Sequence, residues 1–124
     1  QTHKEAARTL VLARLIYFNE HYQYDWNRVA IRNTRRSWGS CSSLKNLNFS
    51  YKLLFLPADL CDYIVVHELC HLAELNHGPR FWSLVAETIP DYRERIQRLK
   101  AIEREWQSVH MLEKLKNSAP TKMV

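Results

Sequence analysis

The hydrophobic pattern of the first residues predicts an amphipathic helix. Between His3 and Tyr22, apolar side chains recur at intervals of three and four positions: Ala7, Val11, Leu15, Phe18 and Tyr22. This spacing places them on one face of a helix, and basic residues such as Arg14 fall outside the stripe. The segment should therefore turn one face to a core and the other to solvent.

The next part of the chain alternates apolar and polar positions, as half-buried strands do. Val29 and Ile31 alternate with polar neighbours, and Gly39 lies in a short extended piece. In the segment that follows, Leu47, Phe49 and Tyr51 should share one face, opposite Asn48 and Ser50. We expect a small antiparallel sheet of about three strands.

Helical patterns fill the rest of the chain. Pro57 suits the first turn of a helix that should stop near Asn76, because Gly78 and Pro79 follow. A short helix should begin at Pro79 and bury three residues: Phe81, Trp82 and Val85. After Pro90, a longer helix should carry an inner face of Tyr92, Ile96, Leu99, Ile102, Trp106 and Val109, before a tail from about Asn117. The fold class is therefore α+β.

Composition narrows the class of protein. A length of 124 residues suits a single domain, 1–124, with one core. Three cysteines argue against a disulfide framework and favour a reducing, cytoplasmic compartment. No apolar run approaches the roughly 20 residues of a membrane span, and no signal-peptide pattern opens the chain. The net charge of +5 favours acidic partners in general and gives weak support for nucleic acid.

A cluster of polar residues interrupts the most apolar of these helices. His67, Glu68 and His71 form the pattern H-E-x-x-H. Residues four apart lie about 6 Å along a helix and nearly in line, so both imidazoles can reach one zinc ion. Glu68 lies about 100° around the helix from His67, where its carboxylate can deprotonate a water that the metal acidifies.

A catalytic zinc needs a third protein ligand, and two residues compete for this role. His77 would lie about 15 Å beyond His67 on an unbroken helix, so it can reach the metal only if the helix ends and the chain turns back. Glu74 shares the face of the two histidines but would extend about 4–5 Å past His71, which suits a supporting role better. We favour His77 as the ligand.

The same pattern also occurs on helices that bind no metal. In that case the histidines and Glu68 would form a solvated stripe. Against this reading, the flanking positions are apolar on every side, with Ile64, Val65, Val66, Leu69, Leu72 and Leu75. Burial of such a polar set without a metal or partners would be costly. A site for one zinc ion is the better interpretation.

Three segments give the chain a resemblance to a known family. They read RRSWGSCSS, NLNFSYKLLFLP and DYIVVHELCHLAELNHGPRFW. In this order they resemble the YgjP-like zinc metallopeptidases, relatives of the SprT-like and WLM proteases in the zincin group. The resemblance implies a minimal zincin fold of one helix, a small sheet, the metal-binding helix and C-terminal helices. It also implies His67, His71 and His77 as metal ligands and Glu68 as the catalytic glutamate.

The chain departs from the pattern of these relatives in two turns. Leu44, Lys45 and Asn46 occupy a turn that often holds glycine in this family, and Asn46 is the residue we expect in the left-handed conformation. Metzincins, a more distant zincin group, place glycine where Glu74 stands here. The turn toward the third ligand should therefore come later, near Asn76.

Several other residues are weaker candidates, each with a structural alternative. Trp38 could border a substrate, with the extended backbone that follows it pairing with a peptide, or be a buried core residue. Arg80 could bind a substrate carboxylate or an oxyanion, and Tyr51 could do the latter, although structural roles are favoured for both. Cys41 and Cys70 could ligate metal, but Cys70 fits a small core position better, and so does Cys61. The basic run on the last helix is interleaved with acidic residues, as solvated ion pairs are.

The sequence therefore predicts a zinc metallopeptidase that acts on protein or peptide substrates. Two alternatives remain open. One is a DNA-associated protease like the SprT-like relatives, and the other is a non-catalytic interaction module stabilised by zinc.

Overall fold

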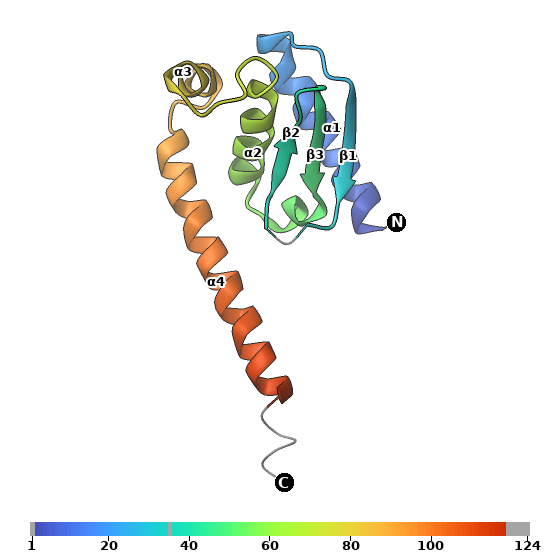
Figure 1. Cartoon of the computed structure of the whole chain (residues 1–124), viewed down its shortest axis with the longest axis vertical. Helices are drawn as coiled ribbons and strands as arrows, with labels where there is room; N and C mark the ends of the chain where they lie inside the picture. The colour runs from blue at the N-terminus through green and yellow to red at the C-terminus, as the bar shows by residue number, and fades with distance from the viewer. Residues whose placement is uncertain (1, 35, 119–124) are drawn as a thin grey trace. The chain divides into compact units, whose positions relative to one another are not determined.

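The computed structural model of the chain describes residues 2–34 and 36–118. It divides into two units, residues 1–92 and 93–124. Within the first unit, α1 (His3–Tyr22) precedes a three-stranded sheet, and α2 (Ala58–Cys70) and α3 (Pro79–Thr88) follow it (Figure 1). Nearly all of α4 (Tyr92–Ser118) belongs to the second unit. The α+β class is confirmed, whereas the boundary of a single domain, 1–124, stays a prediction.

The first helix forms as its sequence pattern predicts. The Oγ of Thr2 accepts a hydrogen bond of 3.1 Å from the backbone N–H of Glu5, which caps the start of α1. At the other end, Gln23 adopts a left-handed conformation with φ of 58° and closes the last turn. The buried residues of α1 are those of the predicted stripe: Ala7, Val11, Leu15, Phe18 and Tyr22.

The sheet is mixed, so the prediction of a wholly antiparallel sheet was wrong. Its strands are β1 (Arg28–Arg32), β2 (Gly39–Cys41) and β3 (Asn46–Ser50), in the order β1-β3-β2. The central strand, β3, runs antiparallel to β2 and parallel to β1. In this order β3 lies between β1 and β2, so β1 does not pair with the next strand in sequence. As a result, β2 is an edge strand.

The turn between β2 and β3 places a different residue in the left-handed region from the one expected. Lys45 has φ of 64°, whereas Asn46 begins β3 and pairs with Arg28. The backbone N–H of Lys45 donates to the carbonyl of Ser42 over 2.9 Å, which closes the turn. Because Lys45 carries a Cβ, this conformation costs about 1 kcal/mol that glycine would avoid.

The core lies between the sheet and the two helices α1 and α2. These helices contact each other, and α1 contacts β1 while α2 contacts β2. The inward side chains of the sheet are buried: Val29, Ile31, Leu47 and Phe49. Tyr51 was predicted to continue the buried face of β3, and this was wrong. It begins the 3-10 helix η1 (Tyr51–Phe55), and Ser50, which was expected on the opposite face, is buried.

The last two helices follow their predictions in part. α3 begins at Pro79 and buries Phe81 and Val85, but Trp82 is partly exposed. Of the predicted inner face of α4, Leu99 is buried and Val109 is exposed. α4 continues through the predicted start of the tail to Ser118, and the rest of that tail lies outside the described residues.

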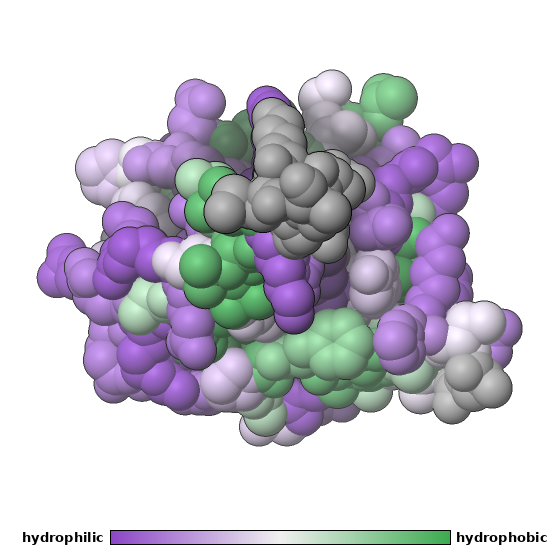
Figure 2. Space-filling model, turned by 90° about the horizontal axis from the view of Figure 1, so that it is seen from below, coloured by the Kyte–Doolittle hydropathy of each residue, from purple (hydrophilic) through white to green (hydrophobic). Residues whose placement is uncertain are grey.

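The surface carries both hydrophilic and apolar side chains. Figure 2 shows hydrophilic and apolar residues interspersed on the surface. Exposed apolar residues include Ile16, Tyr17, Phe55 and Leu75. Within the described part of the chain, no helix combines the length and apolar character that crossing a membrane requires.

Candidate metal centre

The C-terminal end of α2 brings two imidazoles together. His67 lies in its last turn, and His71 is the residue that caps it. Their Nε2 atoms are 3.2 Å apart. This is the convergence that a spacing of four residues on one helix predicts.

The helix ends earlier than Asn76, so the predicted end was wrong. α2 stops at Cys70, and a turn follows it. The N–H of Leu72 donates to the carbonyl of Leu69 and the N–H of Ala73 to that of Cys70, each over 3.1 Å. These bonds span three residues rather than four, so the last turn tightens and the chain leaves the helix axis. The turn toward His77 therefore begins before Glu74, not after it.

His77 returns to the two helical histidines from the loop between α2 and α3. Its Nε2 lies 3.0 Å from that of His71 and 3.1 Å from that of His67. His71 is buried, whereas His77 is exposed on the solvent side of the cluster. The structure therefore places His71 and His77 on different segments, as a three-histidine site requires.

The three nitrogen atoms fit the ligand geometry of zinc. Their separations of 3.0–3.2 Å are close to the roughly 3.3 Å expected between ligands of a tetrahedral zinc with Zn–N bonds of about 2.0–2.1 Å. Within residues 2–34 and 36–118, they form the one group of three or more metal-ligating side chains that converge in this way. All three donors are imidazole nitrogens, which suit zinc among other transition metals.

Hydrogen bonds to the second ring nitrogen orient two of the imidazoles. Nδ1–H of His71 donates to the carbonyl of Glu74 over 2.9 Å, which leaves its Nε2 with a free lone pair. Nδ1 of His67 shares a hydrogen bond of 3.0 Å with the hydroxyl of the buried Tyr63. We did not identify Tyr63 from the sequence, although its position four residues before His67 on an apolar helix is a usable signal.

Glu74 contributes to the cluster through its backbone, and its carboxylate points to another partner. Oε1 of Glu74 lies 3.2 Å from Nε of Arg80. The Arg80 side chain is 87% exposed, so this ion pair is at the surface. The pair links the loop that carries His77 to the first turn of α3.

Aromatic rings from α3 pack beneath the three imidazoles. The buried ring of Phe81 stacks on His71 with a centroid distance of 4.3 Å, and its centroid lies 4.9 Å from His67 and 5.1 Å from His77. The ring centroid of Trp82 lies 6.0 Å from those of both His67 and His77. The sequence predicted both aromatic residues as core, but it did not show that they support the imidazoles.

Burial keeps the histidines of α2 neutral. It lowers the pKa of His67 to about 3, with smaller contributions from His71 and His77. Burial also lowers the pKa of His71. A neutral imidazole keeps the lone pair that a metal ion needs. The cluster is therefore chemically ready to accept a cation.

Glu68, which follows His67 on α2, is buried. Its side chain is 6% exposed, and burial raises the pKa of its carboxyl to about 8. No hydrogen bond joins this carboxylate to another described residue. Its close neighbour is Gly39 of β2, where a Cβ atom would lie 3.0 Å from Cγ of Glu68. Such a carboxyl is suited to exchange protons near neutral pH.

The remaining candidates lie in different places. Tyr51 belongs to η1, where its ring contacts those of His3 and Phe55. Because η1 precedes the first turn of α2, it lies at the opposite end of that helix from the histidine cluster (Figure 1). Trp38 lies next to Gly39, and its carbonyl accepts a hydrogen bond of 2.9 Å from the N–H of Ser50.

The three cysteines stay outside the histidine group. Cys61 and Cys70 are buried and Cys41 is half-buried, and all three are free thiols. Burial raises the pKa of Cys41 to about 11, and the charge of Glu68 adds to this shift. The core role predicted for Cys70 and Cys61 agrees with their burial.

Comparison with known proteins identifies the family of the chain. The chain resembles the metallopeptidase zymogen abylysin of Pyrococcus abyssi, with 25% identity, a TM-score of 0.66, and coverage of 73% of this chain and 92% of that one. It also shares its fold with the metallopeptidase zymogen jannalysin of Methanocaldococcus jannaschii, with 22% identity, a TM-score of 0.58, and coverage of 79% and 95%. No curated protein sequence matches the chain. The model of the YgjP-like metallopeptidase domain matches residues 1–102, so the chain belongs to the YgjP-like metallopeptidase family.

Proposed function

We propose that this metallopeptidase is zinc-dependent, with His67, His71 and His77 as ligands of one zinc ion and Glu68 as the general base. The observation that carries this proposal is the triangle of Nε2 atoms, with sides of 3.0–3.2 Å. The buried carboxyl of Glu68, the residue after His67 on α2, supports its role in proton transfer.

The proposed chemistry divides between the metal and the chain. When bound, zinc would supply a Lewis acid that acidifies water and polarises the scissile carbonyl. Glu68 accepts the proton of the attacking water and returns it to the leaving amine. Burial raises the pKa of this carboxyl in the metal-free site, and a nearby cation would favour its ionised, proton-accepting form.

The edge strand β2 is the proposed docking place for a peptide. The family implies protein or peptide substrates, and β2 (Gly39–Cys41) has one edge that no strand of the described sheet covers. An extended peptide can add to such an edge through backbone hydrogen bonds. Trp38 lies directly before this strand and Arg80 lies near the His77 loop, so both stay candidates for substrate contact. Tyr51 does not belong to the proposed site, because it packs at the opposite end of α2.

The proposal is tested by metal analysis together with peptide cleavage for the wild type and Glu68→Gln. Both proteins should hold one zinc per chain, and the variant should cleave about 10²–10⁴-fold more slowly. Glu20→Gln, the same change at an exposed position of α1, is the matched control and should cleave at the wild-type rate. Unchanged cleavage by Glu68→Gln would contradict the role of Glu68, and absence of metal from the wild type would contradict the site.

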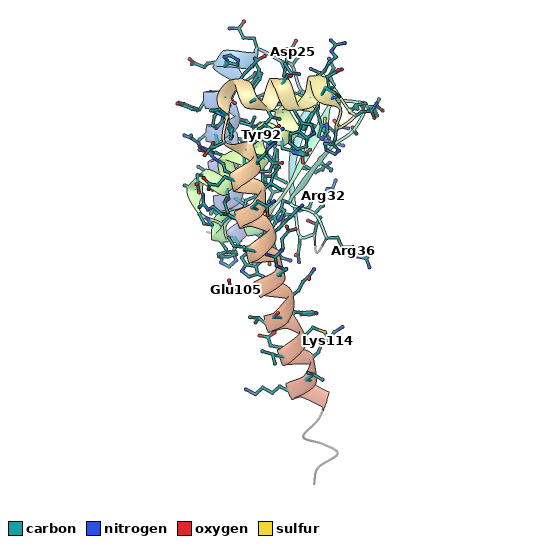
Figure 3. The ribbon with its side chains drawn as sticks, turned by 90° about the vertical axis from the view of Figure 1, so that its left-hand side faces the viewer. Asp25, Arg32, Arg36, Tyr92, Glu105 and Lys114 are labelled. Atoms are coloured by element: carbon teal, nitrogen blue, oxygen red, sulfur yellow. The ribbon has the colours of Figure 1, made fainter. Side chains whose placement is uncertain are left out.

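Recruitment to nucleic acid is a weaker alternative that the charge distribution supports in part. Arg36 projects from the loop between β1 and β2, and Arg32 lies at the end of β1 (Figure 3). On α4, however, acidic residues such as Glu105 interleave with basic ones such as Lys114 (Figure 3). DNA binding with a steep salt dependence would support this alternative, and no binding at low salt would remove it.

A non-catalytic zinc module has less support. Such a site would be closed by a fourth protein ligand. Among the described residues, no fourth histidine, cysteine or carboxylate joins the three imidazoles. The exposed position of His77 also leaves one side of the cluster accessible to solvent.

A further inference from the structure

The two glycines of the chain differ sharply in their surroundings. A Cβ atom at Gly39 would lie 2.9 Å from the backbone oxygen of Asn48, 3.0 Å from Cγ of Glu68 and 3.2 Å from Oε2 of Glu68. A Cβ atom at Gly78 would have no neighbour within 4 Å. Only the first position is therefore closed to a larger residue by its neighbours.

The backbone conformation of Gly39 does not explain the glycine. Neither glycine has a positive φ, and Gly39 lies in a regular strand, where any residue can adopt the backbone angles. A glycine in a strand interior weakens the strand, and it often marks a place where another group approaches closely. Here the approaching group is the side chain of Glu68.

The Glu68 side chain packs against the backbone of strand β2. The side chain is buried, yet no described residue donates a hydrogen bond to it. Helix α2 contacts strand β2, which brings the carboxylate against the bare backbone of Gly39. The orientation of this carboxylate therefore depends on the space that the missing side chain leaves.

We propose that Gly39 is a positioning residue for Glu68. The backbone of Gly39 forms the wall on which the carboxylate rests, so a methyl group at this position moves the carboxylate away from its present place next to β2. This inference rests on the proposed role of Glu68 as general base. A displacement of about 1 Å in a reacting group can cost about 10²-fold in rate.

The first test compares Gly39→Ala with Gly78→Ala, which adds the same methyl group in open space. Gly39→Ala should lower kcat by about 10²-fold while KM and the zinc content stay near the wild-type values. Gly78→Ala should keep most of the wild-type kcat. A wild-type kcat for folded Gly39→Ala would overturn the proposal. A variant in which only the zinc content falls or only KM rises would overturn it as well.

The second test does not depend on activity, because the added methyl group also meets the backbone oxygen of Asn48 and can destabilise the fold. Gly39→Ala is introduced into the wild type and into Glu68→Ala, and the denaturation midpoints of all four metal-free proteins are compared. If the added methyl group meets the Glu68 side chain, the decrease in denaturation midpoint caused by Gly39→Ala should be at most half as large in the Glu68→Ala background as in the wild type. Equal losses in both backgrounds would assign the clash to Asn48 and overturn the proposal.

The two tests also separate this inference from the proposed function. If Gly39→Ala does not fold alone, recovery of folding in the Glu68→Ala background supports the contact, and no recovery overturns it. Full activity of Glu68→Gln would instead remove the general base. In that case the denaturation midpoints would still report the contact between Gly39 and Glu68, but Gly39 would position no catalytic group.

Discussion

The histidine cluster joins two regions that hold their side chains in different ways. On α2 (Ala58–Cys70), backbone hydrogen bonds of the helix set the relation of His67 to His71. In the loop of residues 71–78, two side-chain contacts hold the imidazoles instead: the hydrogen bond from Nδ1 of His71 to the Glu74 carbonyl, and the packing of the Phe81 ring against His77. The regular region fixes two of the imidazoles locally, whereas the position of the third depends on tertiary contacts.

The largest expected effect comes from removal of the loop ligand. His77→Ala should weaken zinc binding by roughly 100-fold or more, since each ligand of a zinc site contributes a few kcal/mol. The denaturation midpoint of the metal-free protein should change little, because His77 is exposed. Competition with a chelator measures the affinity, and His110→Ala, an exposed histidine of α4, is the control. Wild-type affinity in His77→Ala would mean that the loop does not complete the site.

Sequence reasoning succeeded where local spacing decides the structure and failed where tertiary contacts do. The H-E-x-x-H spacing was enough to predict that His67 and His71 converge. The early end of α2 was not predictable, because Leu72, Ala73 and Glu74 are helix formers and their tight turn depends on His71 bonding to a carbonyl ahead of it.

The sheet shows the same division. Alternation of Val29 with Ile31 and of Leu47 with Phe49 identified the strands, because one face of each is buried. The parallel pairing of β1 with β3 has no signature in the alternating pattern, because alternation shows which face of a strand is buried but not which strand it pairs with. The close approach of Gly39 to Glu68 also required the fold, since the two residues are far apart in sequence.

A smaller effect should follow from a change on the helical side of the comparison. Tyr63→Phe removes the hydroxyl that bonds to Nδ1 of His67 and keeps the ring. Loss of such an outer partner typically weakens metal affinity by about 10–100-fold, and we expect the lower end. Tyr17→Phe, which removes an exposed hydroxyl from α1, should leave the affinity unchanged. Equal affinities for both variants would show that Tyr63 does not orient the ligand.

The metal-free protein should show opposing pH effects from two neighbouring groups of α2. Burial raises the pKa of Glu68 from 4.5 to about 8, so the folded state keeps a proton there that the unfolded state has released. Burial lowers the pKa of His67 from 6.5 to about 3, so the unfolded state binds the extra proton below pH 6.5. Stability should therefore fall as the pH rises from 6.5 to 8, and the contribution of His67 should be lost as the pH falls from 6.5 toward 3.

Glu68→Gln separates these two effects. In the variant, the free energy of unfolding should no longer fall between pH 6.5 and 8, but it should still fall as the pH drops from 6.5 toward 3. Denaturant unfolding in the presence of a chelator measures both limbs. The same decline above pH 6.5 in the variant would mean that another group causes it.

The smallest effect concerns the ion pair that links the loop to α3. Arg80→Ala removes the partner of Glu74 at 3.2 Å, but the pair is exposed, so the free energy of unfolding should fall by less than about 1 kcal/mol. Zinc affinity should stay within about twofold of the wild type by the same reasoning. A loss of affinity comparable to that of His77→Ala would show that the ion pair, rather than the packing on Phe81, positions the loop.

X-ray absorption at the zinc edge tests the central claim most directly. We predict one zinc per chain with three imidazole nitrogens at about 2.0–2.1 Å and no sulfur ligand. His77→Ala should then show one imidazole fewer. Two imidazoles in the wild type, or a sulfur ligand at about 2.3 Å, would contradict the three-histidine site.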